Sequence, residues 1–236
     1  MDPLSSLKGA YVGSMRSVRH GLDRWGSAVG PAQPDQRWRH WAYSLTIVHD
    51  SRAMADLDVP WWTYRAIEAV QEWLSARAQP ARVFEYGSGA STVWLARRTR
   101  EVHSVEHHRE FATLMEPELR SHPNASVRVV EAVPSERPAV PSQKEGHAGL
   151  DFANYVGAID DVPGAFDLVV IDGRAREACL EAAIDRVARD GLIVFDNSRR
   201  RRYRTAIARS GLHERALRGL TPTLPYPEQT SLLTSR

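Results

Sequence analysis

The chain has 236 residues and a formal net charge of only +2 at pH 7. This length accommodates one α/β domain with an N-terminal extension and a full hydrophobic core. The charge excludes the strong basic field of a dedicated nucleic-acid-binding protein, and the single cysteine, Cys179, excludes an internal disulfide and a thiolate metal site. The sequence has no signal-peptide core and no apolar run of membrane-spanning length, so we expect a cytoplasmic protein that does not associate with a membrane.

Residues 1 to 58 are expected to form an N-terminal arm and a helical cap. Residues 1 to about 35 mix glycine, serine, proline and arginine without a sustained period, which is typical of a loosely ordered arm. Residues 37 to 57 have a helical pattern rich in aromatic side chains, which predicts either a layer over the main domain or a wall of a substrate pocket. Tryptophans also suit an interface, so a homodimer is compatible with this region.

The main domain, residues 59 to 236, is expected to begin with a helix. Asp58 is a candidate N-cap, Pro60 suits the first helical turn, and apolar residues recur at helical spacing until shortly before Pro80. The tryptophan at position 61 would then lie at the start of this helix.

The most informative stretch is RVFEYGSGASTVWLAR, residues 82 to 97, in which a strand pattern meets two glycines and passes directly into a helix pattern. Glycine is needed at Gly87 and Gly89 because a side chain in such a turn would keep the backbone from approaching a ligand. Glu85, at the end of the strand, would face the same crevice. A dinucleotide-binding fingerprint requires a third glycine or alanine where this chain has Thr92, and a tight turn without any ligand is the other alternative.

A second strand is predicted over residues 101 to 105, followed by Glu106. An acidic side chain about 20 residues beyond the glycine turn is suited to accept hydrogen bonds from both hydroxyls of a ribose. His107 and His108 follow it, at a predicted solvated helix start.

A helix over residues 111 to 119 and a third strand over residues 126 to 130 come next, and Glu131 follows the strand. The next 30 or so residues are rich in proline and glycine and include His147. That is long for a structureless connection and favours a functional lid, although a plain surface loop explains the stretch equally well.

Two buried strands are predicted over residues 166 to 171 and 191 to 195, with a helix over residues 174 to 187 between them. A basic helix over residues 199 to 209 follows. Two last segments, 213 to 218 and 230 to 234, predict an antiparallel hairpin at the edge of the sheet. This alternation of strands and helices predicts an α/β fold with a doubly wound sheet.

Four motifs resemble those of class I S-adenosylmethionine-dependent methyltransferases, namely FEYGSGAST, SVEHH, FDLVVIDGRAR and GLIVFDNS. The chain is similar in particular to bacterial small-molecule methyltransferases of this class. The resemblance implies a Rossmann-like sheet of order 3-2-1-4-5-7-6 with an antiparallel strand 7. It also implies that S-adenosyl-L-methionine is bound by a set of residues at the strand ends: Glu85, Gly87, Ser88, Gly89, Ser91, Glu106, His107, Glu131 and Asp172.

Asp172, Asp196 and Asn197 follow neighbouring strands, so they are expected to converge on the crevice where doubly wound folds bind ligands. Three oxygen donors suit Mg²⁺ or another divalent cation, and the arrangement resembles the metal site of catechol-type O-methyltransferases. Those enzymes place a lysine shortly after the first aspartate, whereas this chain has Arg174 and Arg176. Two alternatives are that these polar residues cap the following helices, and that the arginines bind an acidic group of the substrate.

These features predict methyl transfer from S-adenosyl-L-methionine to a hydroxyl, or less favourably an amine, of a small molecule, with a natural product among the candidates. Asp172 and His147 are the candidate general bases. One alternative is an RNA or protein methyltransferase, suggested by the arginines between positions 199 and 204. The run surrounds more than one helix face, so a nucleic-acid partner is not favoured. The other alternative is a non-catalytic, cofactor-binding scaffold.

Overall fold

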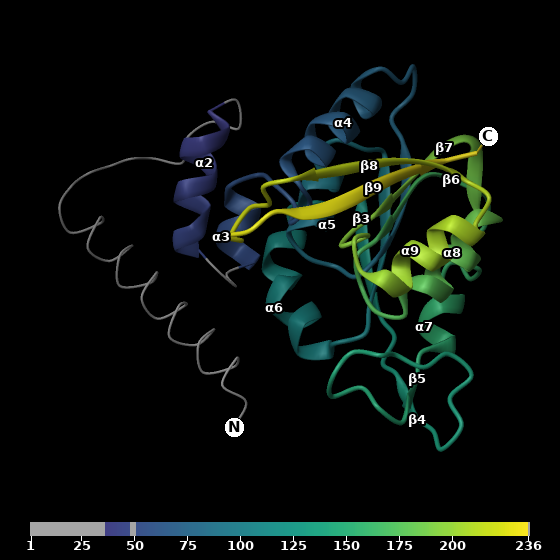
Figure 1. Ribbon diagram of the computed structural model, residues 1–236. Helices are drawn as coiled ribbons and strands as arrows, with labels where there is room; N and C mark the ends of the chain where they lie inside the picture. The colour runs from purple at the N-terminus through teal and green to yellow at the C-terminus, as the bar shows by residue number, and fades with distance from the viewer. Residues whose placement is uncertain (1–35, 48–50, 236) are drawn as a thin grey trace.

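The computed structural model describes residues 36–47 and 51–235. The arm predicted for residues 1 to about 35 therefore lies outside the described residues. The helical cap predicted for residues 37 to 57 comprises helix α2 (Arg37–Ser44), the 3₁₀ turn η1 (Leu45–Ile47) and helix α3 (Ser51–Asp56), which lie at one end of the sheet (Figure 1). In the described part of the chain, no helix is both long and apolar enough to cross a membrane.

A seven-stranded sheet forms the centre of the molecule, with the order β3-β2-β1-β6-β7-β9-β8. Its strands are β1 (Arg82–Tyr86), β2 (Glu101–Glu106), β3 (Ala125–Val129), β6 (Phe166–Ile171), β7 (Val187–Phe195), β8 (His213–Gly219) and β9 (Glu228–Thr234). Strands β1, β2, β3, β6 and β7 pair in parallel, whereas β9 pairs antiparallel with both β7 and β8. Renumbered for this sheet alone, the order is 3-2-1-4-5-7-6 with strand 7 antiparallel, which confirms the predicted topology.

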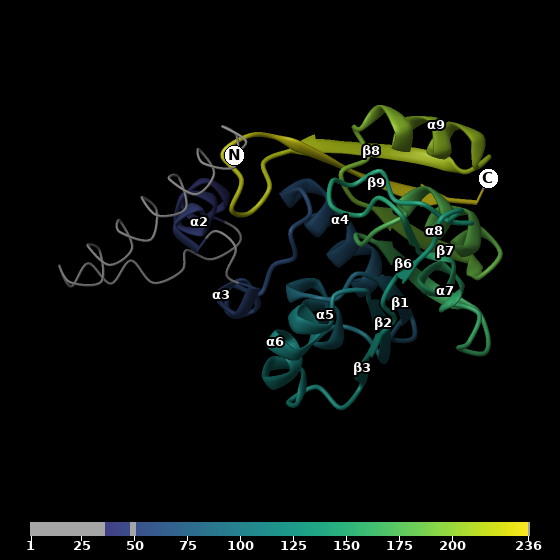
Figure 2. The ribbon, with the colours of Figure 1, turned by 90° about the horizontal axis from the view of Figure 1, so that it is seen from below.

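Helices cover both faces of the sheet. One face carries α4 (Tyr64–Ser75), α5 (Ala90–Ala96) and α6 (Arg109–Leu119), and the other carries α7 (Ala153–Gly157), α8 (Arg176–Ile184) and α9 (Arg201–Arg209) (Figures 1 and 2). Successive residues of a strand point to opposite faces. In β7, Leu192 and Val194 accordingly join the apolar cluster under α4 and α5, while Ile193 and Phe195 join the cluster under α8 and α9. Strand β6 and the second half of β7 are thus buried on both sides, which explains their nearly continuous apolar sequences.

The start of α4 differs from the sequence prediction. Asp58 does not cap this helix; its carboxylate forms ion pairs with Arg97 and Arg98 at the end of α5. The N-cap is Thr63, whose hydroxyl oxygen accepts a hydrogen bond from the backbone nitrogen of Ala66 at 3.3 Å. The same hydroxyl donates to the carbonyl of Leu217 in β8 at 3.1 Å, so the cap also joins α4 to the edge of the sheet.

Two other segments also depart from the predicted pattern. Helix α8 ends at Ile184 and β7 begins at Val187, so the predicted helix was too long and the predicted strand too short. The proline- and glycine-rich segment after β3 is structured, because β4 (Val133–Pro134) pairs with β5 (Leu150–Asp151). The carboxylate of Asp151 accepts hydrogen bonds from the backbone nitrogens of Ala139 and Val140 at 2.8 and 3.0 Å, which fixes the intervening loop to β5.

Candidate active site

A cavity of about 410 Å³ opens at the carboxyl ends of β1, β2 and β6, and we call it the first cavity. Its size suits a small-molecule ligand. Its lining consists of Trp61, Gly87, Ser88, Gly89, Ser91, Glu106, His107, His108, Phe111, His147, Asp172, Gly173 and Arg174. The structure therefore brings together seven of the nine predicted cofactor residues; Glu85 and Glu131 are not part of the lining. Phe111, a lining residue that the sequence analysis missed, lies on a helix whose apolar pattern gave no sign of a ligand.

The turn after β1 requires glycine at only one of its two glycine positions. Gly87 has a φ of +98°, and a Cβ there would lie 2.8 Å from the Cα of Gly173 in the loop after β6. Gly89 has extended backbone, and its Cβ would lie 3.7 Å from the Phe111 ring. Gly87 therefore lets the loops after β1 and β6 approach each other, while the absence of a side chain at Gly89 keeps the cavity open.

Gly87→Ala is expected to lower the free energy of unfolding by about 1–3 kcal/mol, because the methyl group would meet the backbone of Gly173 from a left-handed conformation. Gly89→Ala is the matched control, and we expect it to fold normally while weakening ligand binding. Chemical denaturation of the two variants measures the difference. Equal losses of stability would contradict the close approach of the two loops.

Glu85 lies behind this turn, fully buried, and does not reach the cavity. Its carboxylate accepts hydrogen bonds from the hydroxyls of Ser91, Thr92 and Ser104 at 2.5, 2.6 and 2.9 Å. Thr92 in turn accepts a hydrogen bond from the backbone nitrogen of Gly89 at 2.9 Å. Burial raises the pKa of Glu85 to about 7, although the three hydroxyls oppose this shift. Glu85 thus acts on the cavity indirectly, by holding the glycine turn and the first turn of α5.

The raised pKa of Glu85 predicts an unusual dependence of stability on pH. The carboxyl group has a pKa of about 4.3 in an unfolded chain, and in the folded protein the pKa is about 7. Between these values the folded state holds a proton that the unfolded state has released, so stability falls as pH rises, by up to about 1.4 kcal/mol per pH unit for one group. We expect Glu85→Gln to remove this part of the slope between pH 5 and 8 in denaturation measurements. Parallel stability curves for the two proteins would show that Glu85 ionises normally.

Glu106 presents a carboxylate to the first cavity and is itself held in place. Its Oε2 accepts a hydrogen bond from the backbone nitrogen of Ser88 at 3.1 Å, and its Oε1 accepts one from that of His108 at 2.8 Å. The Nδ1 of His107 lies 2.7 Å from the same Oε1. Burial acts to raise the pKa of Glu106, but the hydrogen bonds from His107 and the backbone outweigh it and leave this pKa below its usual value. The group is therefore an ionised acceptor, as contacts to ribose hydroxyls require.

Ser88 offers independent support for a ligand. Its hydroxyl is buried in the lining and has no hydrogen-bond partner among the described residues. A buried polar atom without a partner costs free energy, and a bound polar ligand would supply the missing hydrogen bond.

His147 reaches the first cavity from the loop between β4 and β5. Its ring centroid lies 5.8 Å from that of His107 and 5.9 Å from that of Phe152. His147 is therefore close to the expected ribose-binding side of the cavity. Glu131, a predicted cofactor residue, does not line the first cavity. It is exposed, and its carboxylate lies 2.7 Å from the Nη2 of Arg109.

Two of the three predicted metal ligands, Asp172 and Asp196, lie on either side of the guanidinium of Arg176. The Nη2 of Arg176 lies 2.8 Å from Oδ1 of Asp172, and its Nη1 lies 3.7 Å from Oδ2 of Asp196. The hydroxyl of Thr230 donates to Oδ1 of Asp196 at 2.7 Å. Burial raises the pKa of both aspartates, and the charge of Arg176 opposes this shift.

This arrangement does not fit a divalent cation. The guanidinium of Arg176 occupies the space between the two carboxylates and supplies a positive charge there, and neither Asp196 nor Asn197 lines the first cavity. Within residues 36–47 and 51–235, no group of three histidine, cysteine, aspartate or glutamate side chains could hold a metal. The residues present therefore do not favour a divalent cation at the predicted site of Asp172, Asp196 and Asn197. Helix capping does not explain these residues either, because the N-caps of α8 and α9 are Ala175 and Arg200.

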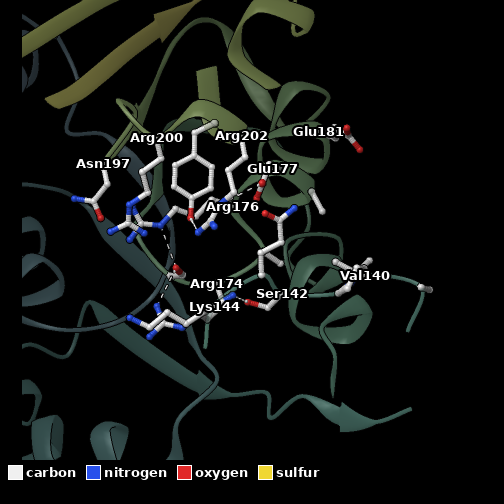
Figure 3. Close-up of a pocket in the computed structure, with 17 residues that line it drawn as sticks. Val140, Ser142, Lys144, Arg174, Arg176, Glu177, Glu181, Asn197, Arg200 and Arg202 are labelled. Carbon is white, nitrogen blue, oxygen red and sulfur yellow. Dashed lines mark hydrogen bonds and ion pairs between the residues drawn. The ribbon is translucent and has the colours of Figure 1, made fainter. Parts of the chain in front are cut away.

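A second cavity, of about 450 Å³, lies at the carboxyl ends of β6 and β7, and Figure 3 shows the side chains that line it. Gly173 and Arg174 line both cavities. The other lining residues come from the loop 139–144 and from the starts of α8 and α9, and their long side chains are Gln143, Lys144, Arg176, Glu177, Glu181, Asn197, Arg200, Arg202 and Tyr203. The sequence did not reveal this cavity, because its three segments are far apart in the chain.

Comparisons with known proteins agree with this fold. A family model described as "Methyltransferase domain" matches residues 84–198, which span β1 to the loop after β7. Among solved structures, precorrin-6y C5,15-methyltransferase from Geobacter metallireducens is 12% identical with a TM-score of 0.51, over 72% of this chain and 88% of that one. A methyltransferase-like protein from Silicibacter pomeroyi is 26% identical with a TM-score of 0.47, over 71% of this chain and 86% of that one. A search of curated proteins gave no match.

Proposed function

We propose that this chain, which belongs to the class I S-adenosylmethionine-dependent methyltransferases, methylates a hydroxyl group of a small molecule and uses Asp172 as the general base. The observation that carries the proposal is the pair of adjoining cavities that share Gly173 and Arg174. In this assignment the first cavity holds S-adenosyl-L-methionine and the second holds the acceptor. The shared loop then separates the methyl donor from the acceptor.

The first cavity offers suitable groups along its length. The carboxylate of Glu106 would accept hydrogen bonds from the ribose, the hydroxyl of Ser88 would find its missing partner, and the backbone of Gly87 and Gly89 would lie against the ligand. S-adenosyl-L-methionine supplies a methyl group already activated by its positively charged sulfur. The main tasks of the protein are therefore to align the acceptor oxygen and to remove its proton.

Asp172 is better placed for proton removal than His147. Asp172 lines the first cavity, is adjacent in sequence to the shared residues Gly173 and Arg174, and remains about one-fifth exposed (21%). Burial raises its pKa, and the charges of Arg176, Arg174 and Arg200, all in the lining of the second cavity, oppose this shift. Asp172 is therefore close to the acceptor cavity, whereas the ring neighbours of His147 lie on the Glu106 side.

A small acceptor is favoured over RNA or protein because the arginines of the 199–204 segment are divided. Arg200 and Arg202 face the second cavity, whereas Arg204 forms an ion pair with Glu214. Only Arg199 and Arg201 remain as exposed charges outside the cavity. This leaves a short basic surface rather than the extended one that nucleic-acid binding requires. A homodimer stays a prediction from the aromatic residues of the cap.

Calorimetric titration with S-adenosylhomocysteine, followed by methyl-transfer assays, tests the proposal. Phenols and alcohols are compared with the matching amines, with and without excess EDTA. We expect saturable binding, transfer to hydroxyl acceptors, and full activity in EDTA, because the guanidinium of Arg176 already lies where a cation between the two aspartates would bind. Absence of binding would remove the cofactor assignment. Transfer to amines alone would contradict the hydroxyl acceptor, and loss of activity in EDTA would contradict the metal-free site.

A further inference from the structure

We infer that the second cavity recognises an anionic group, a carboxylate or a phosphate, on the methyl acceptor. This inference rests on the proposed function, since it assigns the second cavity to the acceptor. The evidence is the identity and pairing of the charged side chains that surround the cavity.

Cationic side chains dominate the lining. Five are present, namely Lys144, Arg174, Arg176, Arg200 and Arg202, against two carboxylates, Glu177 and Glu181. Figure 3 shows the cationic side chains gathered at one end of the cavity, with Glu181 apart from them. Like charges gathered around one cavity repel one another, and an anion bound among them would relieve this repulsion.

The pairing of these groups identifies the two that would contact the anion. Arg176 is engaged by Asp172 and Asp196. The Nε of Arg202 lies 3.6 Å from Oε1 of Glu177.

Arg174 and Arg200, in contrast, form no ion pair with any described residue. The Nε of Arg174 is buried and has no hydrogen-bond partner there, while its Nη1 makes only a 3.4 Å contact to the carbonyl of Gly173. The guanidinium of Arg200 lies 5.8 Å from the ring centroid of Tyr203.

Position and chemistry agree in this assignment. A guanidinium presents a planar fork of N–H donors that matches a carboxylate or a phosphate. Arg174 lines both cavities, so an anion bound to it would hold the rest of the acceptor beside Asp172 and the methyl donor. The two arginines would thereby act as positioning residues for the transfer.

Binding of simple anions tests the inference without knowledge of the acceptor. The protein is saturated with S-adenosylhomocysteine and titrated by calorimetry with inorganic phosphate or with malonate, at constant ionic strength. The variants are Arg174→Ala and Arg200→Ala. Arg201→Ala is the matched control, since Arg201 is exposed on the same helix and outside the cavity. We expect saturable binding of at least one anion that each cavity variant weakens by at least about tenfold and the control leaves unchanged.

The outcomes are distinguishable. Preference for phosphate or for malonate identifies the anionic group. The inference would be overturned if neither anion binds saturably, or if the cavity variants bind it as well as the wild type does. Retained binding of S-adenosylhomocysteine in that case would leave the methyltransferase assignment standing. Binding of bulk tRNA that Arg201→Ala weakens as much as Arg200→Ala would also overturn it, by assigning these arginines to a nucleic-acid surface.

Discussion

Asp172→Asn is expected to lower kcat by about 10²- to 10⁴-fold while changing the affinity for S-adenosylhomocysteine by no more than about threefold. The amide has the shape of the carboxylate and retains an oxygen that can accept the hydrogen bond from Arg176, which in the wild type is 2.8 Å long. The fold around the shared loop should therefore persist. What is lost is the ability to take the proton of the acceptor hydroxyl.

The pH profile separates this role from a structural one. Burial raises the pKa of Asp172 against the opposing charges of Arg176 and Arg174. A general base acts when ionised, so wild-type kcat should rise with pH through this raised pKa, and the residual activity of Asp172→Asn should lack that limb. His147→Gln is the comparison variant, with a smaller expected loss. A larger loss in His147→Gln than in Asp172→Asn would transfer the role of base to His147.

The fold was predictable because its signals are local. The strand, Gly87 and the helix that follows occur in one stretch, and strand β6 and the second half of β7 are nearly continuous apolar runs. The sheet order was implied by the resemblance to class I methyltransferases, with which the predicted hairpin at the end of the chain agrees. The helix caps were less predictable. Asp58 and Thr63 are both good N-cap residues, and only the ion pairs of Asp58 with two arginines of a different element decide between them.

The site was predictable where sequence order brings residues to strand ends, as for Glu106 and Asp172. The site was not predictable where a side chain occupies the position expected for a ligand or a metal ion. The aspartates at positions 172 and 196 were expected to hold a metal, and their positions at neighbouring strand ends are as expected. Arg176, four residues after Asp172 at the start of α8, supplies a positive charge instead. Likewise, Arg200 and Arg202 were recognised as basic residues, but their common cavity depends on the distant loop 139–144.

Arg176→Met is expected to lower the free energy of unfolding at pH 8 by about 3–5 kcal/mol, because it leaves the buried carboxylate of Asp196 and the partly exposed carboxylate of Asp172 without their countercharge. Arg176 is itself almost fully buried and also donates to the backbone carbonyl of Asp196 at 2.5 Å. Methionine fills much of the same volume, so the loss reflects charge more than a cavity. Urea denaturation measures it, with Arg201→Met as a surface control that should change stability by no more than about 0.5 kcal/mol.

The loss should also depend on pH in a defined direction. Burial and the neighbouring Asp172 hold the pKa of Asp196 at about 7 in the wild type. Without Arg176, the pKa values of both aspartates should rise further. A carboxyl group whose pKa is higher in the folded state stabilises the fold only while it is protonated, so Arg176→Met should recover stability as pH falls from 8 to 5.

Asp196→Asn completes the test of this network. It removes one of the two carboxylates but keeps a polar group beside Thr230 and Arg176. We expect it to lower stability by about 1–2 kcal/mol and to leave kcat unchanged in the folded protein, because Asp196 does not line either cavity. Adding Asp196→Asn to Arg176→Met should restore part of the lost stability, since one unpaired charge is removed. If the two losses simply add, Arg176 and Asp196 are not coupled, and the account of Arg176 as their shared countercharge is wrong.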